Sequence, residues 1–164
     1  MAKSKPKRPA AGKRRPAAKA KSGSRRTPAP RKKARRSPET LRLRGFTPGF
    51  TVNDLERSLA FYTQALGFVT SERWVHDGQL LGVMLKAGAS ELGLSQDDWK
   101  KGRDRRKGVA VRIWCQTTQD VDALAARVRA AGHPLSEEPH DPAWGGRAFS
   151  VDDPDGFQLT IFRA

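Results

Sequence analysis

The sequence predicts an α+β fold of two tandem βαβββ modules, which form a cupped mixed sheet around a central cleft and follow a disordered basic tail. The first observation is a strand–helix pattern that occurs twice, with the glycines that end the two predicted helices, Gly67 and Gly132, 65 residues apart. Repetition at a fixed spacing indicates a duplicated structural unit. The second observation is that the net positive charge is confined to one end of the chain.

The basic tail is distinguished by its composition. Residues 1–40 hold 16 Lys and Arg, a single acid (Glu39), and no Leu, Ile, Val, Phe, Trp or Tyr. Such a segment cannot bury enough apolar surface to offset the entropy of ordering, so we expect it to be disordered. Residues 41–164 hold 16 basic and 16 acidic residues, so the net charge of +15 belongs to the tail. We predict a tail over 1–43 and a domain over 44–164, with modules over about 46–96 and 108–163.

The first module begins with alternating Phe50 and Val52, which predict a strand within 46–53. Asn53 followed by Glu56 has the pattern of a capping box and predicts a helix start. One apolar helix face then follows at helical spacing: Leu55, Leu59, Tyr62 and Leu66. Three strand-like runs come next, over 69–75, 80–85 and 91–95, with a turn at Asp77-Gly78 between the first two.

The second module repeats this order after a charged connector over 97–108. Alternating valines and Ile113 predict a strand over 109–116, and Thr118 or Asp120 is expected to cap the next helix. Strand-like runs follow over 134–137, 148–151 and 157–162. The sequence Asp-Pro-Asp-Gly at 153–156 predicts a tight turn between the last two runs.

Period-two alternation separates the two faces of each strand. In 109–116, the aliphatic residues and Cys115 should face the helix, leaving Arg112, Trp114 and Gln116 for the cleft. In the last strand, Thr160 and Phe162 take the cleft side. In the first strand, the cleft side falls to Thr47, Gly49 and Thr51.

Three stretches resemble the vicinal-oxygen-chelate superfamily of glyoxalase I, extradiol dioxygenases and bleomycin-resistance proteins. They are "TVNDLERSLAFYTQALGF" (51–68), "DVDALAARVRAAG" (120–132) and "PAWGGRAFSVDDPDGFQLTIF" (142–162), and the resemblance covers 46–163. It implies two cupped modules that face each other around a cleft, with helices on the convex side. Metal-free members implied by this resemblance sequester an antibiotic without altering it, usually as homodimers.

The resemblance also implies where a metal would bind, because the family's enzymes hold a divalent ion with His and Glu. Thr47, Arg112 and Thr160 align with three of those positions, and Glu91 or Gly93 falls near the fourth. Threonine is a poor ligand and arginine repels a cation. The three histidines fall in a hairpin turn, past a helix end and in a loop: His76, His133 and His140. We therefore expect neither a metal nor a cofactor.

The expected cleft residues have the character of a small-molecule binding site. Trp114 and Phe162 offer flat apolar area, and Arg112 offers a fork of donors for a carboxylate or a surface for stacking. The candidate ligand-binding residues are Thr47, Arg112, Trp114, Gln116, Trp144, Thr160 and Phe162. They predict a planar or anionic ligand, with antibiotic sequestration as one role. The sequence shows no catalytic set, and the alternative is a glyoxalase-like lyase or dioxygenase with an atypical metal site.

The basic tail predicts non-specific, salt-dependent binding to nucleic acid. Its clustered cations are Lys13, Arg14, Arg15, Arg25, Arg26, Arg31, Lys32, Lys33, Arg35 and Arg36. A DNA-associated protein that acts mainly through its tail is thus a further alternative, and a merely solubilising extension is the other interpretation of the tail. The chain has no apolar run of about 18 residues, no apolar signal region and one cysteine. We expect a cytoplasmic protein without membrane contact, associated with the nucleoid where the tail binds DNA.

Overall fold

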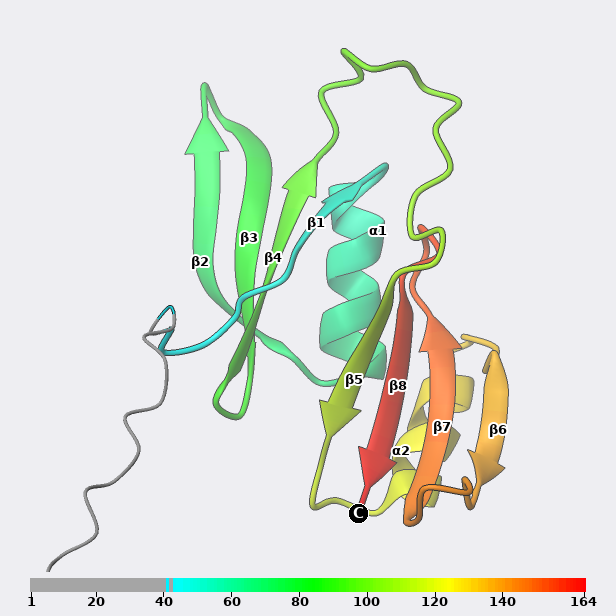
Figure 1. Cartoon of the computed structure of the whole chain (residues 1–164). Helices are drawn as coiled ribbons and strands as arrows, with labels where there is room; N and C mark the ends of the chain where they lie inside the picture. Colours follow the sequence, from blue (N-terminus) through cyan, green and yellow to red (C-terminus); the bar gives the residue numbers. More distant parts are fainter. Residues whose placement is uncertain (1–40, 42) are drawn as a thin grey trace, which may run out of the picture. The chain divides into compact units, whose positions relative to one another are not determined.

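The computed structural model describes residues 41 and 43–164, and all but two residues of the predicted tail lie outside this described part. The compact unit spans Arg42–Ala164. Its elements follow the order of two βαβββ modules (Figure 1). The first module comprises β1 (Gly49–Val52), α1 (Leu55–Ala60), the π-helical turn η1 (Phe61–Ala65), β2 (Val69–His76), β3 (Gln79–Ala87) and β4 (Ser90–Gln96). The second comprises β5 (Arg112–Gln116), α2 (Val121–Ala130), β6 (Glu137–His140), β7 (Arg147–Asp152) and β8 (Gln158–Arg163).

Each module has its own four-stranded mixed sheet, and the two sheets have the same topology. The strand orders are β1-β4-β3-β2 and β5-β8-β7-β6. In both sheets the first and last strands of the module pair in parallel, and the remaining neighbours are antiparallel. This confirms the predicted duplicated α+β fold. Among the described residues, no helix is long and apolar enough to span a membrane.

The core lies between each sheet and its helix. Its fully buried side chains include Val52 and Tyr62, which the sequence assigned to the helix side and the helix face, together with Phe61, Val83, Leu85, Leu94, Val128, Phe149 and Val151. The modules also contact each other within the unit. The rings of Phe50 and Phe157 stack with centroids 4.0 Å apart. The Arg127 guanidinium of α2 donates to the main-chain oxygens of Ala65 and Leu66 at 3.0 and 2.7 Å.

A buried turn fastens the second module to the first helix. Asp153, which precedes the Pro154-Asp155-Gly156 turn, is 5% exposed. Its carboxylate accepts hydrogen bonds from the main-chain N–H groups of Asp155 and Phe157, each at 2.9 Å. It also accepts one from the Tyr62 hydroxyl at 3.1 Å. Burial raises the pKa of Tyr62, and Asp153 raises it further, so the hydroxyl remains protonated and donates.

The start of α1 differs from the prediction. The N-cap is Asp54, whose side chain accepts from the main-chain N–H of Arg57 at 2.9 Å. Asn53, the predicted cap, instead donates from its main-chain N–H and its side-chain amide to Asp155 in the other module. The capping box is therefore wrong by one residue, because a long-range partner competes for Asn53. The prediction of Asp120 as the cap of α2 is confirmed, since its carboxylate accepts from Ala123 N–H at 3.0 Å.

Three strand predictions were also displaced. The predicted strand 109–116 begins only at Arg112, because Gly108 and Ala110 have φ values of +64° and +59° and form a turn. Val109 and Val111 are consequently exposed and do not reach the helix side. The run predicted over 134–137 is replaced by β6 over Glu137–His140. The first strand occupies Gly49–Val52 rather than 46–53.

One outer edge of the first sheet is formed by β2, and all eight of its residues are exposed. Its pairing with β3 shifts register twice, between Thr70 and Glu72 and again between Trp74 and Val75. The Trp74 ring lies over Gly82 of β3, where a β-carbon would overlap the ring. This edge is therefore irregular and well solvated.

Candidate functional site

The candidate site lies on the side of the second sheet that faces away from α2. We call it the β5–β8 face and define it by Arg112, Trp114 and Gln116 of β5 and Gln158, Thr160 and Phe162 of β8. The parallel register of β5 and β8 pairs Arg112 with Gln158, Trp114 with Thr160, and Gln116 with Phe162. Five predicted ligand-binding residues therefore share one face, as alternation required.

An aromatic cluster covers one end of this face. Trp114, Trp144 and Phe162 contact one another edge to face, with ring centroids 5.2 to 6.0 Å apart. Trp144 reaches the cluster from the loop before β7, in which Gly145 and Gly146 have positive φ values. A β-carbon on Gly146 would overlap the main-chain oxygen of Arg163, so only glycine lets this loop lie so close to β8. Trp114 and Trp144 remain 52% and 51% exposed, which leaves apolar ring area available for a ligand or partner.

A buried hydrogen-bonded row crosses the middle of the face. The Ser150 hydroxyl donates to Glu137 at 2.5 Å, and the hydroxyl oxygens of Ser150 and Thr160 are 3.0 Å apart. Ser150 is fully buried and Thr160 is 4% exposed. The Thr160 hydroxyl is therefore buried in a hydrogen bond within the sheet and is not presented to solvent. The sequence did not identify Glu137 or Ser150, because their proximity depends on the register of β6 and β7.

Polar groups and a cavity lie at the other end of the face. Arg112 donates from Nε to the Gln158 side-chain oxygen at 2.5 Å, a contact that uses one of the five N–H donors of its guanidinium. Beside it is an open cavity of about 570 Å³, whose lining includes Arg106, Lys107 and the exposed Val109 and Val111. The lining also includes Arg112 and one acid, Asp152, so cations outnumber acids, and together with the aliphatic side chains they suit an anion with an apolar body.

The remaining predicted site residue, Thr47, is exposed and precedes β1 in the first module. The donor set that the family alignment assigned to a metal does not fit a divalent ion. Arg112 is a cation, the Thr160 hydroxyl is hydrogen-bonded to that of Ser150, and Glu91 forms an ion pair with Lys86 at 3.3 Å. In the described part of the chain, no three His, Cys, Asp or Glu side chains gather as a metal site would require.

The histidines and the cysteine lie apart from this chemistry. His133 packs edge to face on Phe61, and His76 is exposed beside Asp77. His140 was placed in a loop by the sequence, but it ends β6 in register with Ala148. Burial raises the pKa of Cys115 to about 11, so its thiol is protonated at neutral pH and is not a nucleophile.

Arg147, the first residue of β7, forms ion pairs that the sequence did not predict. Arg147 donates to Asp122 of α2 at 2.7 and 3.1 Å and to Asp141 at 3.2 Å. The hydrogen bond from Arg147 lowers the pKa of Asp122. These contacts tie α2 to the loop that carries Trp144, so they help to hold the aromatic cluster in place.

Comparison with known proteins finds one family whose model matches most of the chain. Residues 46–161 match the family described as the Glyoxalase/Bleomycin resistance protein/Dioxygenase superfamily. No curated protein sequence matches the chain.

Solved structures with the same fold include proteins from several bacteria. TioX from Micromonospora sp. ML1 is 20% identical with a TM-score of 0.60, over 71% of this chain and 95% of TioX. Protein SA1046 from S. aureus is 22% identical with a TM-score of 0.61, over 76% and 96% of the two chains. A glyoxalase-related enzyme from Fulvimarina pelagi is 20% identical with a TM-score of 0.61, over 74% and 89%. Similarity at this level of identity shows the shared fold alone.

Proposed function

The chain belongs to the glyoxalase/bleomycin resistance protein/dioxygenase superfamily, and on that premise we propose that it binds a planar or anionic small molecule on the β5–β8 face. The observation that supports this most is the cluster of Trp114, Trp144 and Phe162, with both tryptophans exposed, on the same face as the Arg112 guanidinium. Flat apolar rings bind a planar body, and a nearby guanidinium binds a carboxylate or phosphate. Sequestration of a toxic compound such as an antibiotic is the role we propose for this binding.

An enzymatic role is the alternative, as a glyoxalase-like lyase or a dioxygenase with an atypical metal site. The donors on the β5–β8 face do not fit a divalent ion, because Arg112 and the hydrogen-bonded Thr160 take the positions where ligands are needed. The face instead offers ring surface and hydrogen-bond donors. We therefore favour binding without chemical change.

Ligand binding should depend on both parts of the proposed site. In a panel of planar and anionic compounds, we expect at least one to raise the melting temperature and to bind measurably by calorimetry. Arg112→Ala and Trp114→Ala should each weaken that ligand by about tenfold or more, equivalent to about 1.4 kcal/mol. Arg73→Ala, an exposed arginine on β2, is the matched control and should bind as the wild type does. A panel without any binder, or unchanged affinity in both site variants, would refute the proposal.

We also propose that the protein is a homodimer, in which a second copy covers part of the exposed sheet surface. Large apolar side chains are exposed on strands of both sheets, including Val69, Trp74, Leu81 and Trp114. Exposed apolar area of this kind is typical of interaction surfaces. Native mass spectrometry would report the oligomeric mass and any bound ligand together, and a stable mass of 18.1 kDa at micromolar concentration would contradict the dimer.

A second function is supported by the charge distribution, and we propose that the basic tail binds nucleic acid non-specifically. Sixteen cations in 40 residues precede a domain in which basic and acidic residues balance. Such binding would place the protein in the cytoplasm, in association with the nucleoid. We expect the full chain to bind duplex DNA in a low-salt gel shift and residues 41–164 to bind at least tenfold more weakly. Equal binding by the two chains would exclude the tail as the DNA-binding element.

A further inference from the structure

We propose that the connector between the modules, residues 97–108, is a second nucleic-acid contact, made by the folded unit itself. The proposal takes its class of partner from the function proposed for the tail but rests on different residues. Six of the 16 basic residues in 41–164 lie within the connector: Lys100, Lys101, Arg103, Arg105, Arg106 and Lys107. Its acids are Asp97, Asp98 and Asp104. The connector therefore carries a net +3, and the rest of 41–164 a net −3.

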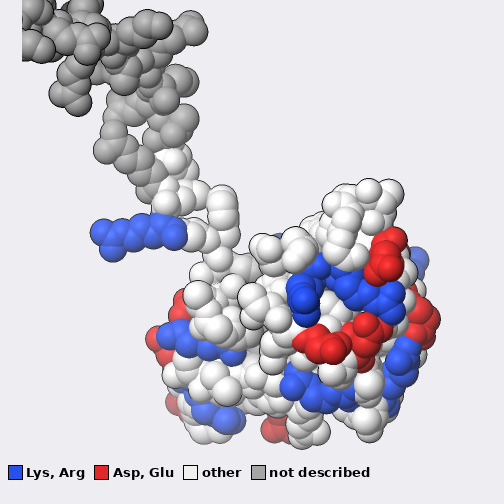
Figure 2. Space-filling model, turned by 90° about the horizontal axis from the view of Figure 1, so that it is seen from below, with Lys and Arg blue, Asp and Glu red and all other residues white. Residues whose placement is uncertain are grey.

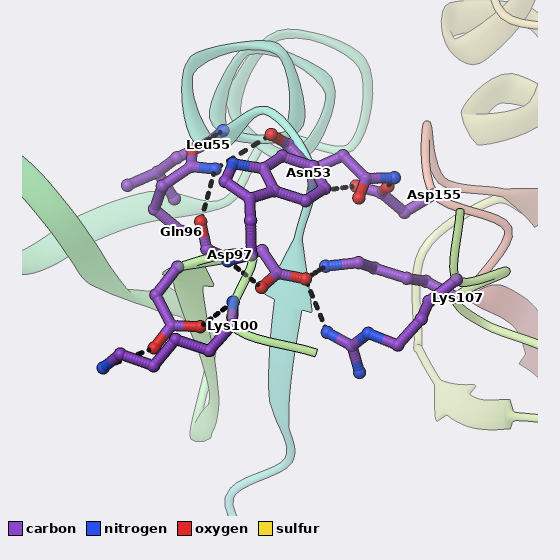
Figure 3. Close-up of polar contacts among 10 residues, drawn as sticks. Asn53, Leu55, Gln96, Asp97, Lys100, Lys107 and Asp155 are labelled. Atoms are coloured by element: carbon purple, nitrogen blue, oxygen red, sulfur yellow. Dashed lines mark hydrogen bonds and ion pairs between the residues drawn. The ribbon is translucent and has the colours of Figure 1, made fainter. Parts of the chain in front are cut away.

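A buried carboxylate holds the connector in a defined shape. Asp97 is 4% exposed and accepts hydrogen bonds from the Trp99 main-chain N–H at 2.8 Å and from Arg105 Nη2 at 2.6 Å (Figure 3). Lys107 Nζ contacts the same carboxylate. The hydrogen bond from Lys107, followed by that from the Trp99 N–H, lowers the pKa of Asp97 to about 2. At neutral pH the charged carboxylate thus joins the beginning of the connector to its end.

The middle of the connector folds back on Trp99. This residue has a φ of +60°, and its main-chain oxygen accepts from Gly102 N–H at 2.9 Å. The Arg103 guanidinium lies 4.7 Å from the centroid of the Trp99 ring, within the range of a cation–π contact. The basic side chains are therefore carried by a loop with its own contacts, which reduces the entropy lost when they bind a partner.

Three of the six basic side chains of the connector remain available for a partner. Arg105 and Lys107 are engaged by Asp97, and Lys100 pairs with Asp98 at 3.0 Å. Lys101, Arg103 and Arg106 are exposed and form no ion pair with an acid anywhere in residues 43–164. The connector projects from the top of the unit in Figure 1. On the face seen from below, basic and acidic side chains are instead intermixed (Figure 2).

A phosphate backbone fits these cations better than a membrane does. Duplex DNA carries one negative charge per ~1.7 Å of its axis, so several phosphates lie within reach of three side chains that belong to one short loop. Binding to an anionic membrane is usually strengthened by apolar side chains that enter the lipid. Between residues 97 and 107 the only large apolar side chain is Trp99, which is half-buried beneath Arg103. The tail likewise contains no large aromatic or branched aliphatic residue.

The salt dependence of DNA binding by the full chain tests the connector. The variant Lys101→Gln/Arg103→Gln/Arg106→Gln lowers the net charge from +15 to +12. Binding to a fluorescently labelled DNA duplex would be measured by fluorescence anisotropy at salt concentrations between about 50 and 300 mM. Each lost phosphate contact should reduce the slope of log K against log salt by about 0.9, so the triple variant should lose about 2.7. Lys101→Gln/Arg106→Gln keeps Arg103 on Trp99 and should lose about 1.8.

The matched control removes the same charge elsewhere. Arg57→Gln/Arg73→Gln/Arg163→Gln changes three exposed arginines outside the connector and also gives +12. This control should retain the wild-type slope within about 0.5 units, a margin of roughly half a phosphate contact. Equal slopes for the connector and control variants would overturn the connector proposal and leave the tail proposal standing. Loss of binding to vesicles with one-third phosphatidylserine, with an unchanged DNA slope, would overturn it in favour of a lipid surface.

Discussion

Replacing Asp153 by Ala is expected to lower the free energy of unfolding by about 3–5 kcal/mol. The carboxylate accepts from Tyr62, Asp155 and Phe157, and the site is buried. Alanine would leave three donors without an acceptor and would release the turn before β8 from the first helix. Urea unfolding followed by circular dichroism measures the change.

Two further variants separate the contributions at this turn. Tyr62→Phe removes one donor and leaves the carboxylate with its two main-chain partners, so we expect a loss of about 1–2 kcal/mol. Asp155→Ala removes a half-buried acid that accepts from Asn53, and the expected loss is about 1 kcal/mol or less. A loss below 1 kcal/mol for Asp153→Ala would show that this buried turn does not fasten the modules.

Gly108→Ala is expected to destabilise the unit by about 3 kcal/mol or more. Gly108 has a φ of +64°, and a β-carbon there would overlap the main chain of Gly156 and Phe157. Because these are backbone atoms, no side-chain rotation can relieve the overlap. The end of the connector and the turn before β8 would have to separate, which should also enlarge the cavity beside Arg112. Thermal and urea unfolding measure the loss.

Gly78→Ala is the control for Gly108→Ala. Gly78 has a φ of +78°, but an added β-carbon would meet no atom within 4 Å. The control therefore carries only the cost of the left-handed backbone conformation for alanine, about 1–2 kcal/mol. Similar losses for the two variants would mean that the contact between Gly108 and Gly156 is not tight.

Local patterns predicted most of the fold because each βαβββ module is encoded by short-range signals. Alternation defined the buried side of β8, helical spacing placed Leu55 and Tyr62 on the buried face of the first helix, and the turn at Asp77-Gly78 has φ values of +49° and +78°. The errors arose where a partner distant in sequence decides the outcome. Asn53 donates to Asp155 instead of capping the helix. Gly108 packs against Gly156, and β5 therefore begins at Arg112, three residues later than predicted.

The candidate site was predictable only in part, for the same reason. Alternation alone assigned Arg112, Trp114 and Phe162 to one face. It could not show that Trp144 folds onto that face, because this depends on two glycines in a loop. Nor could it show that Thr160 is buried against Ser150, which depends on the pairing of β7 with β8. The connector was recognised as charged, but its fold around Asp97 required the structure.

The irregular edge formed by β2 has a consequence for solubility. An exposed edge strand offers free main-chain donors and acceptors to any extended chain, and flat edges of this kind seed aggregates. Here two register shifts interrupt the edge, and Glu72 and Arg73 place opposite charges between them. An incoming strand would have to match these shifts and desolvate both charges. The eight exposed residues of β2 are therefore expected to resist the addition of a further strand to this edge.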